Sequence, residues 1–212
     1  RAPSPRASSA ALMHSIPHSS PCAPAFGLIA TAGIRSTLGR NFQFDPSTTE
    51  PGSPFVTIAH WSPLVGIDGW DAAGRRARAL AQPHIEASTG NGKHFVSHAS
   101  QIIAILLYAA HLSGDDMTVV YRWVTTLTVE DTKVDLFTIR DETATGGDEG
   151  AGIALDQFKG YAEMNDQELA KYVSSASEIL EAYKYVSVRR ISKDVNFDPY
   201  QFVRSRDTLH IT

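Results

Sequence analysis

Hydrophobic residues fall in short runs near the two ends of the chain and at helical spacing in its middle. Glycine and proline separate the short runs, which is the pattern of strands between turns. We therefore expect strands or short extended segments at 26–31, 41–44, 55–58 and 208–212. Asp198-Pro199 has the composition of a helix cap followed by a first helical turn.

The middle of the chain predicts a series of helices. An amphipathic helix is expected at 69–82, whose apolar face consists of Trp70, Ala73, Ala77 and Leu80. After a polar loop, the apolar run 95–112 is too long for a strand and predicts a buried helix that ends at Gly114. Further helices are expected after an Asp115 cap, at 131–140, at 150–162 and from Asp166 to about Val186.

Strand-rich ends thus enclose a helical block, which predicts an α/β chain dominated by helix. We assign residues 1–68 to a partial core, 69–190 to a helical domain and 191–212 to a return strand of the core. A strand that arrives at the last residue has no successor to pair with. We therefore expect the sequence to be part of a longer protein.

Composition narrows the class of protein. The hydrophobic fraction of 42% and the charged fraction of 20% are those of a globular protein. Cys22 is the only cysteine, which excludes an internal disulfide and a multi-cysteine zinc site and favours a reducing, cytoplasmic setting. The longest apolar run, 102–110, is shorter than the roughly 20 residues of a membrane helix, so we expect no transmembrane segment.

Charge is unevenly distributed behind a net value of -4. Acidic residues crowd the stretch 130–168, whereas basic residues form clusters elsewhere. Two clusters are candidates for contact with DNA phosphates or a protein partner: Arg75, Arg76 and Arg78, and Arg189, Arg190 and Lys193. The alternative for each cluster is an ordinary solvated surface.

A degenerate phosphate loop is the one nucleotide-site candidate. Such a loop needs glycine for close backbone approach, lysine for the phosphates and a hydroxyl for magnesium. Its position here would be held by Arg6, Ser8, Ser9 and Ala10, with Ser9 in place of the lysine and Ala10 in place of the hydroxyl. We therefore expect this chain to bind neither ATP nor magnesium. The stretch 87–94 also resembles a phosphate loop at its centre, but Ala87 stands in place of the first glycine and His94 in place of the closing serine or threonine. We therefore predict that this stretch is a loop between helices.

Catalytic and metal-binding patterns are weak. His94 and His98 have the i, i+4 spacing that places two imidazoles on one helix face, but the sequence supplies no third histidine or cysteine beside them. No Ser/His/Asp order and no paired carboxylates support a hydrolase. We assign no catalytic residue and no metal site.

Several blocks in order carry a family resemblance. They are Trp61–Gly66, Trp70-Asp71, Arg76–Leu80, Leu106–Gly114, Arg122-Trp123, Asn196–Pro199 and Ser205–Thr208, with weaker matches at Ser36–Arg40 and Phe44–Pro46. Taken together they resemble the actinobacterial conjugative DNA-transfer coupling ATPases of the TraG/TraD type, which serve type IV secretion. The resemblance covers roughly residues 35 to 212.

The resemblance implies a RecA-like P-loop core that encloses an all-alpha domain, with ATP and magnesium as cofactors. It also implies hexamers at the cytoplasmic face of the membrane and contact with DNA and relaxosome proteins. The missing Walker lysine at Ser9 and a Walker B strand that would lie beyond Thr212 imply that this fragment is inactive as an ATPase. Two alternatives stay open: a non-catalytic helical module that binds DNA or a relaxosome protein, and a remnant of a decayed gene.

Overall fold

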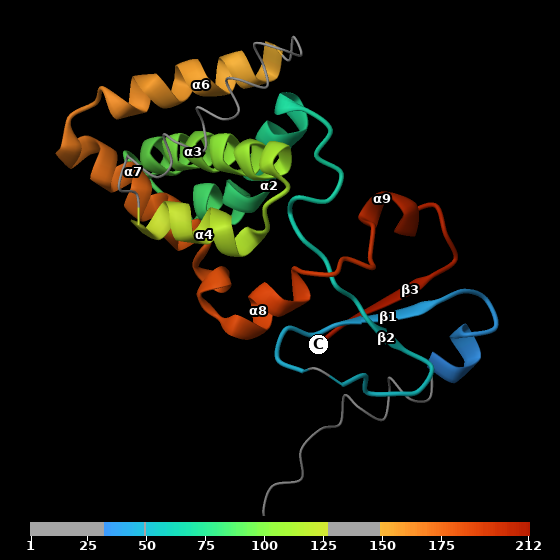
Figure 1. Cartoon of the computed structure of the whole chain (residues 1–212). Coiled ribbons are helices and arrows are strands. Elements are labelled where there is room, and N and C mark those ends of the chain that lie inside the picture. The colour runs from blue at the N-terminus through green and yellow to red at the C-terminus, as the bar shows by residue number, and fades with distance from the viewer. Residues whose placement is uncertain (1–31, 49, 127–148) are drawn as a thin grey trace, which may run out of the picture.

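The computed structural model describes residues 32–48, 50–126 and 149–212, and it consists of a small sheet beside a larger group of helices (Figure 1). The sheet has the strands β1 (Asn41–Phe44), β2 (Thr57–Ile58) and β3 (Thr208–Ile211). All pairings are parallel, in the order β2-β1-β3. The chain is therefore α/β and dominated by helix, as predicted.

The sheet has one apolar and one polar face, because side chains alternate along β1. Phe42 packs against the Phe197 ring edge to face at 5.2 Å. On the opposite face, the Asn41 side-chain amide donates to the Ala32 carbonyl at 3.0 Å, and the Gln43 side-chain oxygen accepts from the Gly52 amide at 2.9 Å. These bonds offset part of the cost of burying the two side chains, although the Asn41 side-chain oxygen has no hydrogen-bond partner among the described residues.

The helical unit, defined here as α2 to α8, is built around one central helix. α3 (Gly92–Ser113) packs against α2 (Trp70–Ala87), α4 (Met117–Thr126), α6 (Glu149–Ala162) and α7 (Asp166–Ile179). Every residue from Ile102 to Ala110 is buried, so this stretch needs partners on all sides. α3 ends where Gly114 adopts a left-handed conformation with φ 73°, which confirms the predicted glycine stop.

By length and composition α3 could also cross a membrane. Most of its apolar stretch is buried inside the described part of the chain, and the core helix of a soluble protein meets the same criteria. The longest unbroken apolar run, 102–110, is only part of this helix.

Some predicted boundaries were wrong. The helix from Asp166 ends at Ile179, because Leu180 leaves helical geometry and a short 3-10 turn (Glu181–Lys184) carries Tyr183 into the core before α8 (Val186–Ile191) begins. The predicted helix 69–82 continues to Ala87, although Pro83 lies inside it and cannot donate a backbone hydrogen bond.

The cap of α4 was also misassigned. The carboxylate of Asp116, and not that of Asp115, accepts the Thr118 amide at 2.7 Å and begins the helix. By contrast, Asp198 accepts the Tyr200 amide at 2.8 Å and begins α9 (Pro199–Phe202) as predicted. The predicted segments 26–31 and 131–140 lie outside the described residues.

A narrow neck joins the helical unit to the sheet (Figure 1). The chain enters at His60-Trp61 and leaves at Ile191, where the Trp61 amide donates to the Ile191 carbonyl at 2.9 Å. The side chain of Asn196 links the two segments of the neck. Its oxygen accepts a hydrogen bond from the His60 amide at 2.9 Å, and its amide donates to the Ile58 carbonyl at 2.9 Å. Entry and exit therefore lie side by side.

Candidate anion-binding groove

A polar groove of ≈ 630 Å³ runs between α2, α3 and α6. Its walls hold cationic, amide and hydroxyl side chains from all three helices. They are Trp70, Asp71, Gly74, Arg75, Arg78, Gln82, Ile85, Lys93, Ser97, Ser100, Gln101, Ala104 and Gln157. The volume is in the range of sites that hold a small ligand, about 300 to 1,000 Å³.

Three cations face one anion in this groove. Arg75 and Arg78 are three residues apart on α2 and so lie on the same helix surface. Lys93 enters from the first turn of α3, where exposed backbone amides and the helix dipole add positive potential. Among the residues that the structure describes, Asp71 is the only acidic member of the lining, so the described walls carry an excess of positive charge.

Neutral hydrogen-bonding groups complete the walls. Ser97, Ser100 and Gln101 follow one another at helical spacing along α3, and Gln157 faces them from α6. Trp70 closes one part of the groove, with its ring edge on to Tyr108 at 5.8 Å. Hydroxyls and amides beside fixed cations are the groups that bind phosphate oxygens in proteins.

Arg76, the third member of the predicted α2 cluster, points elsewhere. Its guanidinium donates to the Val65 carbonyl at 2.8 Å and lies over the Trp61 ring at 5.6 Å. Arg76 therefore fastens the loop that leads into α2. The sequence placed the three arginines together, and the helix geometry separates them.

The second predicted basic cluster does not contribute to the groove lining. Lys193 pairs with Asp116 at 2.9 Å, and Arg189 donates to the Lys184 carbonyl at 3.3 Å, whereas Arg190 is exposed. Burial raises the pKa of the Asp116 carboxyl, but hydrogen bonds from Lys193 and Thr118 outweigh it and leave that pKa below its usual value. Two of these three cations are thus engaged within the chain.

A histidine–tyrosine cluster lies beside the groove, where α6 and α7 cross α3. His98 Nδ1 is 2.9 Å from the Tyr161 hydroxyl, and that hydroxyl donates to Gln101 Oε1 at 2.5 Å. The His98 ring also stacks on Tyr172, with ring centroids 4.5 Å apart. Gln101 therefore belongs both to this cluster and to the groove.

The neighbouring His94 makes a second contact of the same kind. Because the Tyr172 hydroxyl donates to the Glu168 carboxylate at 2.6 Å, its oxygen is left to accept from His94 Nε2 at 3.3 Å. The two histidine rings lie 4.5 Å apart. The i, i+4 pair that suggested a metal thus binds tyrosines, and no group of three metal-ligating residues occurs in the part of the chain that the structure describes.

The cluster shifts the acidity of its members. Burial, followed by the nearby His94, lowers the pKa of His98, while Glu168 acts in the opposite direction. Burial raises the pKa of Tyr161 to about 12. The hydrogen bond to Glu168 and then burial raise the pKa of Tyr172. Neither tyrosine is indicated as a site residue by the sequence pattern, because the histidines that they contact lie on another helix.

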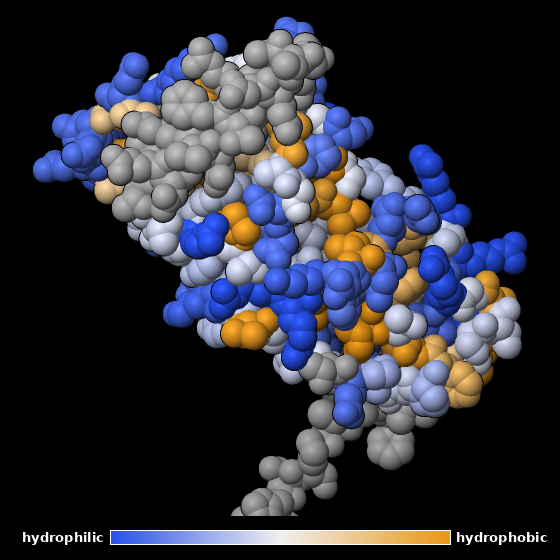
Figure 2. Space-filling view, viewed as in Figure 1, coloured by the Kyte–Doolittle hydropathy of each residue, from blue (hydrophilic) through white to orange (hydrophobic). Residues whose placement is uncertain are grey.

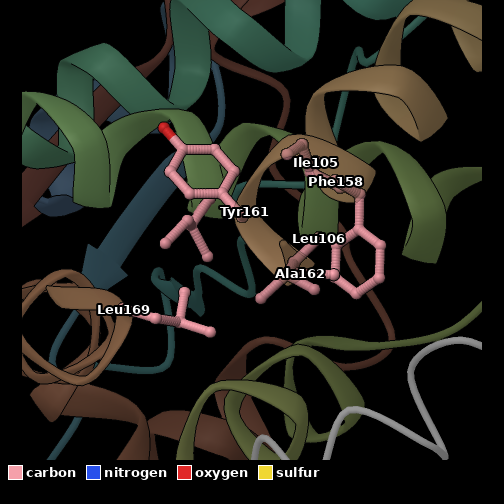
Figure 3. A pocket seen from close by; sticks show the side chains of 7 residues that line it. Ile105, Leu106, Phe158, Tyr161, Ala162 and Leu169 are labelled. Carbon is pink, nitrogen blue, oxygen red and sulfur yellow. The ribbon is translucent and has the colours of Figure 1, made fainter. Parts of the chain in front are cut away.

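One alternative site is an apolar cavity lined by side chains of α3, α6 and α7 (Figure 3), but its volume is too small for a ligand. It has ≈ 20 Å³ and is lined by Ile102, Ile105, Leu106, Phe158, Tyr161, Ala162 and Leu169. That space holds about one water molecule, and an apolar lining offers such a water no partners. On the face shown in Figure 2 the surface is mostly hydrophilic with scattered apolar patches, which is usual for a globular protein.

The candidate phosphate loop, Arg6, Ser8, Ser9 and Ala10, lies outside the described residues. The described part of the chain therefore neither places it nor tests it. No family model, no curated protein and no solved structure matches this chain.

Proposed function

We propose that this chain is part of a conjugative DNA-transfer coupling protein of type IV secretion and that its helical unit is a non-catalytic DNA-binding module. The observation that carries the binding role is the convergence of Arg75, Arg78 and Lys93 on one groove with serine and glutamine walls. The groove binds the phosphates of a DNA strand, because its charges and donors match phosphodiester oxygens.

The arrangement of the strands supports the coupling-protein part of the proposal. Both β2 and β3 flank β1 in a parallel sheet, and the helical unit separates them along the chain. A partial RecA-like core that encloses an all-alpha domain has this order of elements. In this proposal the assembled motor, a hexamer at the cytoplasmic face of the membrane, uses ATP and magnesium, whereas this chain supplies the groove.

Phosphate contacts predict a particular binding behaviour. Each phosphate neutralised on a single strand releases counterions, so affinity falls with salt by a slope of about 0.7 per contact. Contacts to phosphates carry no base information, so affinity should not depend on sequence. With three cations in the groove, binding should be weak and steeply dependent on salt.

Fluorescence anisotropy with a rhodamine-labelled oligothymidylate of about 12 nucleotides, titrated at several salt concentrations, tests this proposal. The double variant Arg75→Ala/Arg78→Ala should lose affinity and lower the salt slope by about 1.4, the value for two lost contacts. The matched double variant Arg189→Ala/Arg190→Ala, which removes the same charge from α8, should keep the wild-type slope.

Two results would overturn the assignment. If the α8 variant lowers the slope and the α2 variant does not, the DNA site lies on α8. If the wild-type chain does not bind the oligonucleotide at low salt, the helical unit is not a DNA-binding module, and recognition of a relaxosome protein becomes the better account.

A further inference from the structure

Gln101 connects the groove to the half-buried His98. Its side chain lines the groove, and its Oε1 accepts the Tyr161 hydroxyl proton at 2.5 Å. The Tyr161 oxygen lies 2.9 Å from His98 Nδ1. Three side chains from α3 and α6 therefore form one hydrogen-bonded chain that runs from His98 to the groove.

The direction of the hydrogen bonds between these three side chains depends on one proton, that of the Tyr161 hydroxyl. A tyrosine hydroxyl has a single proton to donate, so Tyr161 can donate to Gln101 only while its oxygen accepts from His98 Nδ1–H. In that state Gln101 uses its oxygen inside the cluster, and its amide nitrogen, a donor, remains for the groove. A donor at that position favours a bound anion.

When these hydrogen bonds run in the opposite direction, Gln101 presents an acceptor to the groove in place of a donor. If His98 Nδ1 carries no proton, it accepts the Tyr161 hydroxyl proton, and Gln101 must then donate its amide to the tyrosine oxygen. A half-turn of the side-chain amide exchanges nitrogen for oxygen with little change of shape. Gln101 then presents its carbonyl oxygen to the groove, which disfavours an anion.

We propose that His98 acts as a proton-dependent switch of the groove, acting through Tyr161 to decide whether Gln101 presents a donor or an acceptor. Protonated His98 carries a proton on both ring nitrogens, so Nδ1 must donate and the anion-binding direction is fixed. Neutral His98 allows both directions. This inference concerns regulation of the groove and rests on the proposed function for its biological meaning.

The groups around His98 set the pH range. They are His94 on α3, with its ring 4.5 Å away, Tyr161 on α6, and Tyr172 with Glu168 behind it on α7. Burial and then His94 lower the pKa of His98 from 6.5, so it gains its proton only in mild acid. The Tyr161 pKa of about 12 keeps its hydroxyl proton throughout this range.

The test measures binding of the same oligothymidylate between about pH 5 and 8 at constant ionic strength. Thymidine and its phosphodiesters do not titrate there, so changes in affinity belong to the protein. Lowering the pH should tighten binding in all variants that keep their histidines, because positive charge accumulates. The wild type should show an additional gain of about two- to tenfold, the value of one hydrogen bond.

Three variants separate the relay from general charge. Tyr161→Phe keeps the ring and its packing but removes the hydroxyl, and it should lose the additional gain. Gln101→Met should lose it as well, whereas His94→Asn should keep it. Thermal melting of each variant confirms that it folds. A Tyr161→Phe profile identical to that of the wild type would overturn the relay.

A measurement without DNA keeps this inference distinct from the proposed function. The Gln101 side-chain amide signal in ¹⁵N NMR should shift with the titration of His98 in the wild type and not in Tyr161→Phe. A Gln101 signal that ignores His98 refutes the relay. If the signal follows His98 but no oligonucleotide binds at any pH, the relay stands and the DNA-binding proposal fails.

Discussion

The ion pair between Arg40 and Asp207 closes the sheet across 167 positions of sequence. One Asp207 carboxylate oxygen accepts the Arg40 backbone amide at 2.8 Å, and the other accepts the guanidinium at 3.2 and 3.0 Å. The backbones meet closely here, since a Cβ on Gly39 would lie 2.7 Å from the Arg206 carbonyl oxygen. Replacing Asp207 should therefore loosen β3 from β1.

The size of the effect follows from exposure. The Asp207 side chain is 8% exposed and that of Arg40 is 69% exposed, so water screens the guanidinium part of the pair to about 0–1 kcal/mol. The bond to the backbone amide is worth roughly 1.5 to 3 kcal/mol, because its acceptor is charged. We expect Asp207→Ala to cost about 1 to 3 kcal/mol and Asp207→Asn, which keeps a neutral acceptor, about half of that.

The same pair predicts a pH dependence. Burial raises the pKa of Asp207, but hydrogen bonds to the Arg40 amide and guanidinium outweigh it, so the folded-state pKa lies below the usual 3.8. A lowered folded-state pKa gives stability that is complete above the unfolded-state value and is lost as pH falls through the folded-state value. The sheet should therefore weaken in acid below about pH 4.

Hydrogen exchange with mass spectrometry measures this directly. In Asp207→Ala the peptides that contain β1 and β3 should lose protection by about five- to hundredfold, while α3 keeps its protection. Asp156→Ala is the control, since its pair with Lys159 is largely exposed and should contribute almost nothing. Unchanged protection of β3 in Asp207→Ala would refute the reasoning.

The remaining predictions concern the helical unit and the nucleotide. Leu107→Ala should cost about 2 to 5 kcal/mol in urea unfolding, because Leu107 is fully buried and its loss leaves a cavity. A cost below about 1 kcal/mol would contradict that packing. An excised fragment of residues 69–190 should show a cooperative thermal melt, and a melt without cooperativity would refute an independent core. Calorimetry of this chain with ATP and magnesium should show no binding tighter than millimolar, because Ser9 and Ala10 replace the phosphate-binding charge and the magnesium hydroxyl. Micromolar, magnesium-dependent binding would contradict it.

Local signals predicted the elements whose ends depend on the chain itself. The strand Asn41–Phe44 has the predicted bounds, because alternating polar and apolar residues there meet Asp45-Pro46. α3 stops at Gly114, where a glycine supplies the left-handed conformation. The break after Ile179 could not be predicted, since it arises from burial of Leu180 and Tyr183 against other helices. Periodicity alone continues through that point.

The sequence predicted only part of the candidate site, because contacts between helices determine the rest. Sequence clustering indicated Arg75 and Arg78, but the helix phase that turns Arg76 toward Val65 becomes visible only once the loop is placed. Tyr161 and Gln101 are 60 positions apart, and nothing local pairs them. Contacts between helices decide both the groove and the chain of hydrogen bonds beside it.

The neck between the sheet and the helical unit explains how both parts can coexist in one chain. Because the Trp61 amide donates to the Ile191 carbonyl, the chain segments that lead into and out of the helical unit lie side by side. The helical unit can therefore be inserted between β2 and β3 without separating these strands from β1. Arg76 donates to Val65 just inside that entry, so α2, one wall of the groove, is fastened to the neck. In the proposed function, α2 and the neck are the connection through which binding in the groove is linked to the sheet.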